Sequence, residues 1–307
     1  MPLIASPLPA VLSPVVTPFT ATGDVDAAKL AKQCQWLQRH QVGLAVFGTN
    51  SEANSLSVSE RIRALEYLVQ QGGLPGSQMM PGAGACSVPD AVAMSKAAVA
   101  LGCAGTLTLP PFYYKDVPDD GLFAYFSNII EGVGDARLQI YLYNIPPVTK
   151  VGFSLALIER LLKAYPITIV GMKDSSGDWA YTESVIQAFA PAGFRMYAGS
   201  ETFLLRTLRA GGAGCISATT NVNPGPIAAL AAHWQSANAD AQQAALDQVR
   251  QVFQSRPMIP AMKAAIAHFS NDPLWARVRP PLVGLNAEKT QDLVAAMQSI
   301  GFEITGL

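Results

Sequence analysis

The chain has 307 residues, half of them apolar, and its 21 basic and 22 acidic side chains give a formal charge of −1. This length suffices for one large α/β domain or two ordinary ones. A balanced charge argues against nucleic acid or an anionic membrane as a partner. No apolar run reaches the roughly 18 residues of a membrane span. The expected partners are therefore small molecules and further copies of the chain.

The first residues, "MPLIASPLPAVLSP", contain no Lys or Arg and are interrupted by prolines. With Pro2, Pro7 and Pro9 as the breaks and Pro14 at its end, the stretch lacks the basic region and the continuous apolar region of a signal peptide. The four cysteines are far apart in the sequence, which fits free thiols better than a disulfide framework. We therefore expect a short N-terminal tail and a cytoplasmic protein.

Apolar, β-branched runs recur along the first two thirds of the chain and predict eight strands. They cover residues 11–19, 43–48, 78–84, 105–111, 138–145, 167–174, 194–200 and 214–219. Segments with helical periodicity separate them, such as "DAAKLAKQCQWLQRH" from Asp26 and "SERIRALEYLVQQ" from Ser59. Eight strand and helix pairs in about 220 residues favour an α/β fold of the closed, parallel (β/α)8 TIM-barrel type.

The strand signals stop near residue 224, and the remaining segments are predicted to be helical. No GxGxxG motif follows the first strand, which removes the usual support for a dinucleotide-binding fold. We therefore predict a catalytic barrel domain over 1–224. A C-terminal, all-helical appendage over 225–307 would include the last barrel helix.

In such barrels the carboxyl ends of the strands, and the loops that follow them, form the active face. The predicted strand ends select a short set of candidate residues: Thr49, Asn50, Tyr113, Tyr114, Tyr143, Lys173, Ser175, Gly199, Ser200, Glu201, Ile216 and Ser217. The three histidines form no metal-binding pair of the HxxH type, so we predict no metal site.

Lys173 is the one lysine that ends a predicted inner strand, "ITIVGMK". An apolar barrel mouth disfavours its ammonium form, so more neutral amine is available to attack a carbonyl and form a Schiff base. The alternatives are a solvated charge at a strand end and an ion pair with Asp174. Adjacent strand residues point to opposite faces, which makes Asp174 a poor partner if Lys173 faces the barrel interior.

Schiff-base chemistry also needs a group that moves protons near the amine. Tyr143 is suitable because a phenol can donate and then accept a proton, provided that it is acidic enough or that another hydroxyl relays the proton. The alternative for Tyr143 is an ordinary core aromatic, and Tyr113 and Tyr114 would equally fit interface aromatics. Glu201 has two interpretations of similar weight, contact with substrate hydroxyls and a helix N-terminal charge favoured by the macrodipole.

Several motifs together resemble a known family. They are "TPF" at 17–19, "FGTNSE" at 47–52, "LPPFYY" at 109–114, "YLYNIP" at 141–146, "GMKDSSGD" at 171–178 and "GGAGCISATTNV" at 211–222. In this order and spacing they resemble the dihydrodipicolinate synthase and N-acetylneuraminate lyase superfamily, class I pyruvate-type aldolases on (β/α)8 barrels. The resemblance covers nearly the whole chain from residue 13 onward.

The resemblance implies roles for individual residues. Lys173 would form the Schiff base with pyruvate or another 2-keto acid, Tyr143 would transfer protons, and Thr49 would relay them. Tyr113 would reach into a neighbouring subunit's site in a homo-oligomer, commonly a tetramer built as a dimer of dimers. Backbone groups around Thr49 and Asn50, with Ile216, would hold the keto-acid carboxylate. No cofactor or metal is implied.

Two departures from the family pattern narrow the expected activity. Asn50 stands where many members have a second hydroxyl residue, although its amide can still donate a hydrogen bond to a carboxylate. Val148 stands where true synthases carry an arginine for the second substrate's carboxylate, and valine cannot make that charge-assisted bond. We therefore favour an aldolase for 2-keto-3-deoxy sugar acids or 4-hydroxy-2-oxo acids, with Ser175, Gly199, Glu201 and Ser217 as candidate contacts to the substrate. The alternatives are a dehydratase of the same family, 4-hydroxy-tetrahydrodipicolinate synthase, and a non-catalytic protein that binds keto acids.

Overall fold

The computed structural model describes residues 8–307, so the first seven residues of the expected N-terminal tail lie outside it. Seven strands are found in the described part: β1 (Val11–Ser13), β2 (Gly43–Leu44), β3 (Thr106–Thr108), β4 (Ile140–Asn144), β5 (Ile169–Asp174), β6 (Arg195–Ala198) and β7 (Gly214–Ile216). Every recorded strand pair is parallel, and the order across the sheet is β2-β1-β7-β6-β5-β4-β3. This curled parallel sheet is consistent with the predicted (β/α)8 barrel.

The predicted third strand, 78–84, is an extended segment without a strand of its own. Isolated parallel bridges join Met79 to Leu44 and Gly82 to Leu107, so the segment lies between β2 and β3 and links the two ends of the sheet. Pro81 lies between the bridged residues and has no N–H to donate, which interrupts a regular ladder. At Gly82 a Cβ atom would meet the Phe47 carbonyl oxygen at 2.1 Å, so only glycine fits this close approach.

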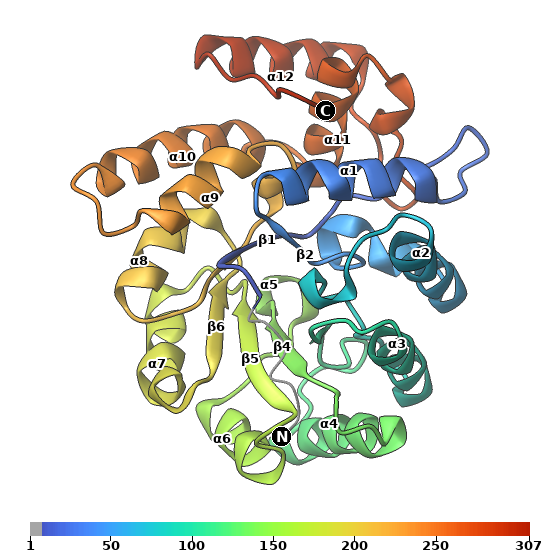
Figure 1. The fold of residues 1–307 in the computed structure, drawn as a ribbon, viewed down its shortest axis with the longest axis vertical. Helices are drawn as coiled ribbons and strands as arrows, with labels where there is room; N and C mark the ends of the chain where they lie inside the picture. The colour runs from blue at the N-terminus through green and yellow to red at the C-terminus, as the bar shows by residue number, and fades with distance from the viewer. Residues whose placement is uncertain (1–7) are drawn as a thin grey trace.

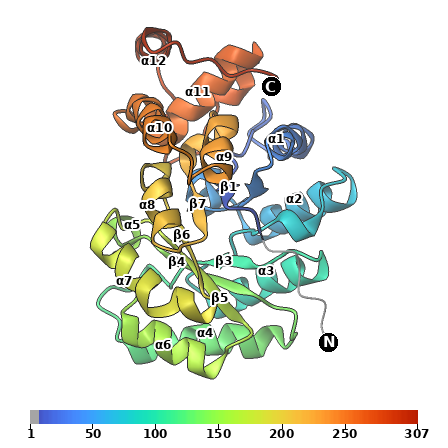
Figure 2. The ribbon, with the colours of Figure 1, turned by 60° about the vertical axis from the view of Figure 1, so that its left-hand side comes forward.

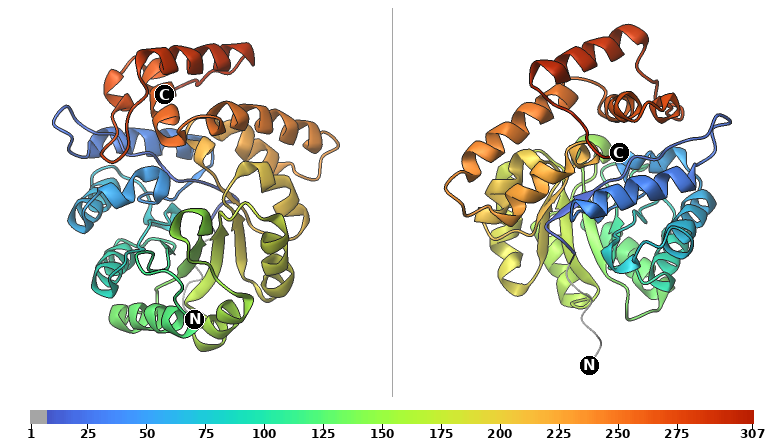
Figure 3. Two further views of the ribbon diagram at one scale, coloured as in Figure 1. Left: turned by 180° about the vertical axis from the view of Figure 1, so that it is seen from behind. Right: turned by 45° about the horizontal axis from the view of Figure 1, so that its top comes forward.

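Twelve α-helices accompany the sheet in residues 8–307. They are α1 (Ala27–Arg39), α2 (Val58–Gln70), α3 (Val88–Ala100), α4 (Asp119–Val133), α5 (Pro146–Thr149), α6 (Leu155–Ala164), α7 (Trp179–Phe189), α8 (Leu204–Arg209), α9 (Pro224–Ala232), α10 (Ala239–Gln254), α11 (Met258–Ser270) and α12 (Ala287–Ser299). The longer helices from α1 to α9 surround the strands, and α10, α11 and α12 gather at one side (Figure 1). The turned views show the same arrangement (Figures 2 and 3).

All four helices from α9 onward follow residue 223, as the sequence predicts for the C-terminal segment. The division into a barrel domain and a helical appendage stays a prediction. No helix between residues 8 and 307 has the length and apolarity required to cross a bilayer.

A buried ion pair joins α11 to the segment that follows β2. Lys263 Nζ lies 2.6 Å from Glu52 Oε1 and also donates to the Thr17 carbonyl at 2.8 Å, and neither charged side chain is exposed. The backbone N–H of Arg279 donates to the second Glu52 oxygen at 2.8 Å. Burial lowers the pKa of Lys263 to about 8, so the lost hydration of the ammonium outweighs the attraction of the carboxylate. These contacts fix Glu52, which directly follows the helical turn η1 (Thr49–Ser51).

Glu60 gives a pH-dependent contribution to stability. Its carboxylate accepts a 2.6 Å bond from Arg279 and completes the capping box of α2 with Ser57. The bond from Arg279 is the main reason that the pKa of Glu60 falls to about 2 in the folded chain. Because this pKa lies below the ordinary value, the stabilisation is complete above pH ~4.5 and is lost as the pH falls toward ~2.

We therefore expect Glu60→Gln to destabilise the protein by about 1 kcal/mol at pH 6, since both partners are partly exposed and solvent screens the pair. The difference should be clearly smaller at pH 3. Urea denaturation of both proteins at the two pH values measures it, and an unchanged difference would contradict the assignment.

Candidate active site

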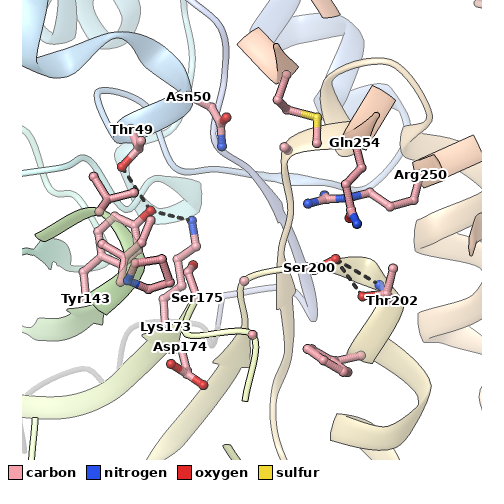
Figure 4. A pocket seen from close by; sticks show the side chains of 18 residues that line it. Thr49, Asn50, Tyr143, Lys173, Asp174, Ser175, Ser200, Thr202, Arg250 and Gln254 are labelled. Atoms are coloured by element: carbon pink, nitrogen blue, oxygen red, sulfur yellow. Dashed lines mark hydrogen bonds between the residues drawn. The ribbon is translucent and has the colours of Figure 1, made fainter. Parts of the chain in front are cut away.

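A cavity of about 500 Å³ opens at the carboxyl ends of the strands (Figure 4). Its lining combines loop residues after the strands with side chains from α10 and α11: Thr49, Asn50, Tyr143, Ile145, Pro147, Val148, Lys173, Asp174, Ser175, Gly177, Gly199, Ser200, Thr202, Phe203, Ala218, Arg250, Gln254 and Met258. This position agrees with the general location of active sites in parallel α/β barrels.

Lys173 lies near the end of β5, between Tyr143 of β4 and Tyr197 of β6 in the strand register. Only 2% of the residue is exposed. Its Nζ is 3.4 Å from the Tyr143 hydroxyl and 4.5 Å from the centre of that ring. No carboxylate of residues 8–307 forms a salt bridge with it. Lys173 is thus a buried amine that is not neutralised by an acid.

The ion-pair alternative for Lys173 fails because Asp174 is bonded elsewhere. The carboxylate of Asp174 accepts bonds from Asn144 Nδ2 at 2.7 Å, from the Ser176 hydroxyl at 2.8 Å and from Thr182 Oγ1 at 2.5 Å. Adjacent strand residues point to opposite faces, as expected. Asp174 therefore anchors the turn after β5 and does not pair with Lys173.

Thr49 and Tyr143 complete a chain of three polar groups. The Thr49 hydroxyl, in the turn after β2, lies 3.1 Å from the Tyr143 hydroxyl, which in turn faces Lys173 (Figure 4). Each hydroxyl can donate or accept, so a proton at the amine has a path to Tyr143 and on to Thr49. The structure thus brings together three residues that are about 30 to 120 positions apart in the sequence.

Two neighbours of Lys173 are poor candidates for proton transfer or covalent chemistry. Tyr197 is buried beside it, and burial raises the pKa of this phenol, so the hydroxyl stays protonated. Burial also raises the pKa of Cys215 well above its usual value, so this thiol is not a nucleophile. Tyr143 is therefore the phenol with both the contact and the access to the cavity.

Of the other predicted site residues, Asn50, Ser175 and Gly199 line the cavity. Ile216 and Ser217 are fully buried and lie outside its lining. Tyr113 is 75% exposed, stacks edge-on against Tyr114 and also lies outside the lining. Its predicted role in a neighbouring subunit's site stays a prediction.

Glu201 begins the helical turn η5 (Glu201–Phe203), which leads into α8, and its side chain is buried. The carboxylate accepts short bonds from the hydroxyls of Ser217 and Thr219, and Arg250 Nη1 lies 3.2 Å from its Oε2. Glu201 thus stands at a helix start, as one interpretation predicted, and its charge is paired with a cation from α10.

Sequence reasoning missed Arg250 and Gln254 on α10 and Met258 on α11, which also line the cavity. The strand-end rule cannot find helical residues. The available signal was indirect: a buried Glu201 requires a cation or several donors, and Arg250 stands in a helix whose other charged residues are few. Residues 8–307 hold no group of three or more His, Cys, Asp or Glu side chains suited to a metal ion.

The fold and its cavity are those of a parallel α/β enzyme with a buried lysine at the active face. Residues 7–300 match the model of the dihydrodipicolinate synthetase family. The chain is 35% identical to an uncharacterized DapA-like lyase of Chloroflexus aurantiacus over 94% of its own length and 96% of that protein.

Two solved structures are also similar. Dihydrodipicolinate synthase from Agrobacterium tumefaciens is 30% identical with a TM-score of 0.85, covering 95% of this chain and 99% of that one. YagE, a prophage protein of the dihydrodipicolinic acid synthase family from E. coli K12 in complex with pyruvate, is 27% identical with a TM-score of 0.87, covering 96% and 99%. The chain therefore belongs to the dihydrodipicolinate synthetase family, whose members are lyases of the aldolase type.

Proposed function

We propose that the protein is an aldolase-type lyase in which Lys173 forms a Schiff base with pyruvate or a 2-keto-3-deoxy sugar acid or 4-hydroxy-2-oxo acid. The observation that carries the proposal is the buried, unpaired amine of Lys173 within 3.4 Å of the Tyr143 hydroxyl. Membership in a lyase family and the similarity to a protein solved with pyruvate support it.

In the proposed reaction the neutral amine of Lys173 adds to the keto carbon, and loss of water gives an iminium ion. For a 4-hydroxy-2-oxo acid, the bond between C3 and C4 then breaks. Its electron pair forms an enamine, and the C4 hydroxyl gives up its proton as an aldehyde forms. Tyr143 accepts or returns the protons, and Thr49 relays them across the 3.1 Å contact. Protonation at C3 and hydrolysis release pyruvate and the free lysine.

The carboxylate of the keto acid would lie against the turn of Thr49 and Asn50, near the backbone of Ile216. Its negative charge would neutralise the iminium ion beside it. The chemistry needs no cofactor or metal, because the iminium ion itself withdraws the electrons. If the iminium ion instead loses a proton from C3, the resulting enamine keeps C4 and can expel the C4 hydroxyl as hydroxide, which takes up that proton to leave as water; this is the dehydratase reaction.

Synthase activity is the second candidate, favoured by relatives such as dihydrodipicolinate synthase from Agrobacterium tumefaciens. Val148, however, lines the cavity and is largely exposed to it, so an apolar side chain stands where a synthase would bind the second carboxylate. Efficient condensation of pyruvate with aspartate semialdehyde would favour the synthase over the cleavage reaction.

Borohydride reduction in the presence of pyruvate tests the proposal. We expect one reduced pyruvyl group per chain, located on Lys173 by peptide mass spectrometry. Screening the release of pyruvate from a panel of 4-hydroxy-2-oxo acids and 2-keto-3-deoxy sugar acids then identifies the substrate. A protein that gains thermal stability from keto acids without adduct or product would be a non-catalytic binder, and the proposal would be wrong.

We also propose that the chain forms a homo-oligomer, a tetramer built as a dimer of dimers. The exposed, stacked pair of Tyr113 and Tyr114 supports it, because two large aromatics rarely stay in solvent side by side. Light scattering coupled to size exclusion measures the assembly, and a monomer at micromolar concentration would contradict it.

A further inference from the structure

The wall of the cavity opposite Lys173 carries a second cation. The side chain of Arg250 extends from α10 toward the middle of the cavity, with Gln254 one helical turn further along (Figure 4). The side chain is 14% exposed, so it is largely withdrawn from bulk water yet reachable from the cavity. A cavity of about 500 Å³ is several times larger than the six heavy atoms of pyruvate require. The Arg250 wall is therefore available to the remote part of a longer substrate.

We propose that Arg250 binds a second carboxylate at the end of the substrate remote from the keto group, so that the substrates are 2-keto dicarboxylic acids. The inference rests on the proposed Schiff-base function, because Lys173 must hold the keto end for Arg250 to select the other end.

The guanidinium group of Arg250 is held in one orientation. Its Nη1 donates to Glu201 at 3.2 Å and to the Ser217 hydroxyl at 3.3 Å, and its Nε donates to Gln254 at 3.1 Å. Nη2 has no hydrogen-bond partner within the described chain. Two of the three nitrogens are therefore occupied by the protein, and the third is left for a ligand.

Glu201 is the positioning residue of this subsite. The hydroxyls of Ser217 and Thr219 donate hydrogen bonds to its carboxylate, and Gln243 of α10 donates to its backbone carbonyl at 2.9 Å. The ends of β6 and β7 thereby fix the part of α10 that carries Arg250. A guanidinium held in place before binding loses little side-chain entropy when a carboxylate arrives.

The charges of the site favour a carboxylate over a neutral hydroxyl or a phosphate group as the ligand of Arg250. Glu201 compensates part of the charge of Arg250, and Asp174 is bonded to Asn144, Ser176 and Thr182. A carboxylate at Nη2 would accept a charge-assisted hydrogen bond. The bond from Nη2 to a neutral hydroxyl would be roughly half as strong. A phosphate dianion would lie close to Glu201 with one free nitrogen to neutralise it.

The test compares two substrates that differ only at the remote end, a 4-hydroxy-2-oxo dicarboxylic acid and the analogue with a hydroxymethyl group in place of the second carboxylate. Pairs with five and six carbons are assayed for pyruvate release with the full-length protein. We expect the wild type to prefer the dicarboxylate. Arg250→Gln should lower kcat/KM for the dicarboxylate by about 10- to 100-fold, the value of one bond to a charged group, and lower it for the analogue much less.

Arg209→Gln is the matched control, because Arg209 pairs with Asp240 at the surface and lies outside the cavity. Arg250→Gln leaves the Glu201 carboxylate buried without its cation, which could itself disturb the site. The double variant Glu201→Gln/Arg250→Gln removes that charge and is measured as well. It should show the same loss of preference for the dicarboxylate over the analogue. Trapping with pyruvate and borohydride should remain in all variants. A wild type that forms the adduct but shows equal kcat/KM for both substrates, or the same decrease for both in Arg250→Gln, overturns the inference. Absence of the adduct from the wild type overturns the proposed function instead.

Discussion

Replacing Lys173 by methionine is expected to abolish turnover, with kcat lower by roughly four orders of magnitude or more, because no covalent intermediate can form. Methionine fills a similar volume and removes a buried, unpaired amine. The melting temperature should therefore stay the same or rise. Pyruvate release and thermal denaturation of the same preparation measure both effects, and loss of activity with unchanged folding assigns the loss to the amine.

Lys96→Met is the control, since Lys96 is exposed on α3 and its loss should change neither quantity. Tyr143→Phe separates the two parts of the proposed mechanism. The borohydride adduct should still form, while kcat should fall by about 10²- to 10⁴-fold because the proposed proton carrier is missing. Full turnover in Lys173→Met would exclude the Schiff-base mechanism, and full turnover in Tyr143→Phe would exclude the relay.

The largest effect on stability is expected at the buried pair of Lys263 and Glu52. Lys263→Met removes the 2.6 Å partner of Glu52 and leaves its carboxylate buried with the Arg279 backbone N–H as its remaining recorded donor. Removing one member of a fully buried pair costs about 3–5 kcal/mol. Because Glu52 directly follows Thr49–Ser51, the loosened turn should also lower kcat. Urea denaturation measures the loss of stability.

The control is Lys29→Met, which breaks a partly exposed pair with Asp272 and should cost less than about 1 kcal/mol. In the double variant Glu52→Gln/Lys263→Met the buried charge is gone and the Gln oxygen can still accept from Arg279. It should recover at least half of the lost stability. Equal effects of Lys263→Met and Lys29→Met would show that burial of the pair contributes little.

The fold was largely predictable because parallel strands buried on both faces are nearly continuous apolar runs. Seven of the eight predicted segments contain the observed strands, though the strands are shorter, since the residues at their ends turn into the loops of the cavity. The segment at 78–84 differs because Pro81 cannot donate and Gly82 must approach Phe47 closely. The apolar pattern of this segment indicates that it is buried. Whether it forms a regular hydrogen-bond ladder depends on contacts with other segments, which the pattern does not reveal.

The residues of the candidate site that lie at strand ends could be predicted from the sequence. Those that lie on helices could not. Tyr143 and Lys173 lie near the ends of β4 and β5, and Thr49 lies in the turn after β2. A parallel sheet brings such strand ends to one face. Arg250 is about 50 residues beyond Glu201, on a helix, and their pairing depends on how α10 packs over the sheet. Periodicity predicts that helix but not its direction or its contacts.

The pairing of β1 bears on how the chain folds during synthesis. β1 pairs with β2, about 30 residues away, and with β7, about 200 residues away, where Leu12 lies opposite Ile216. The first strand of the chain therefore keeps an unpaired edge until nearly three quarters of the protein has been made. Lys263, which neutralises Glu52, is synthesised later still. Such long-range pairings slow folding and leave apolar edges exposed until the partner strand has been made. A nascent chain that stops before residue 263 therefore carries Lys173 but lacks the partner of Glu52.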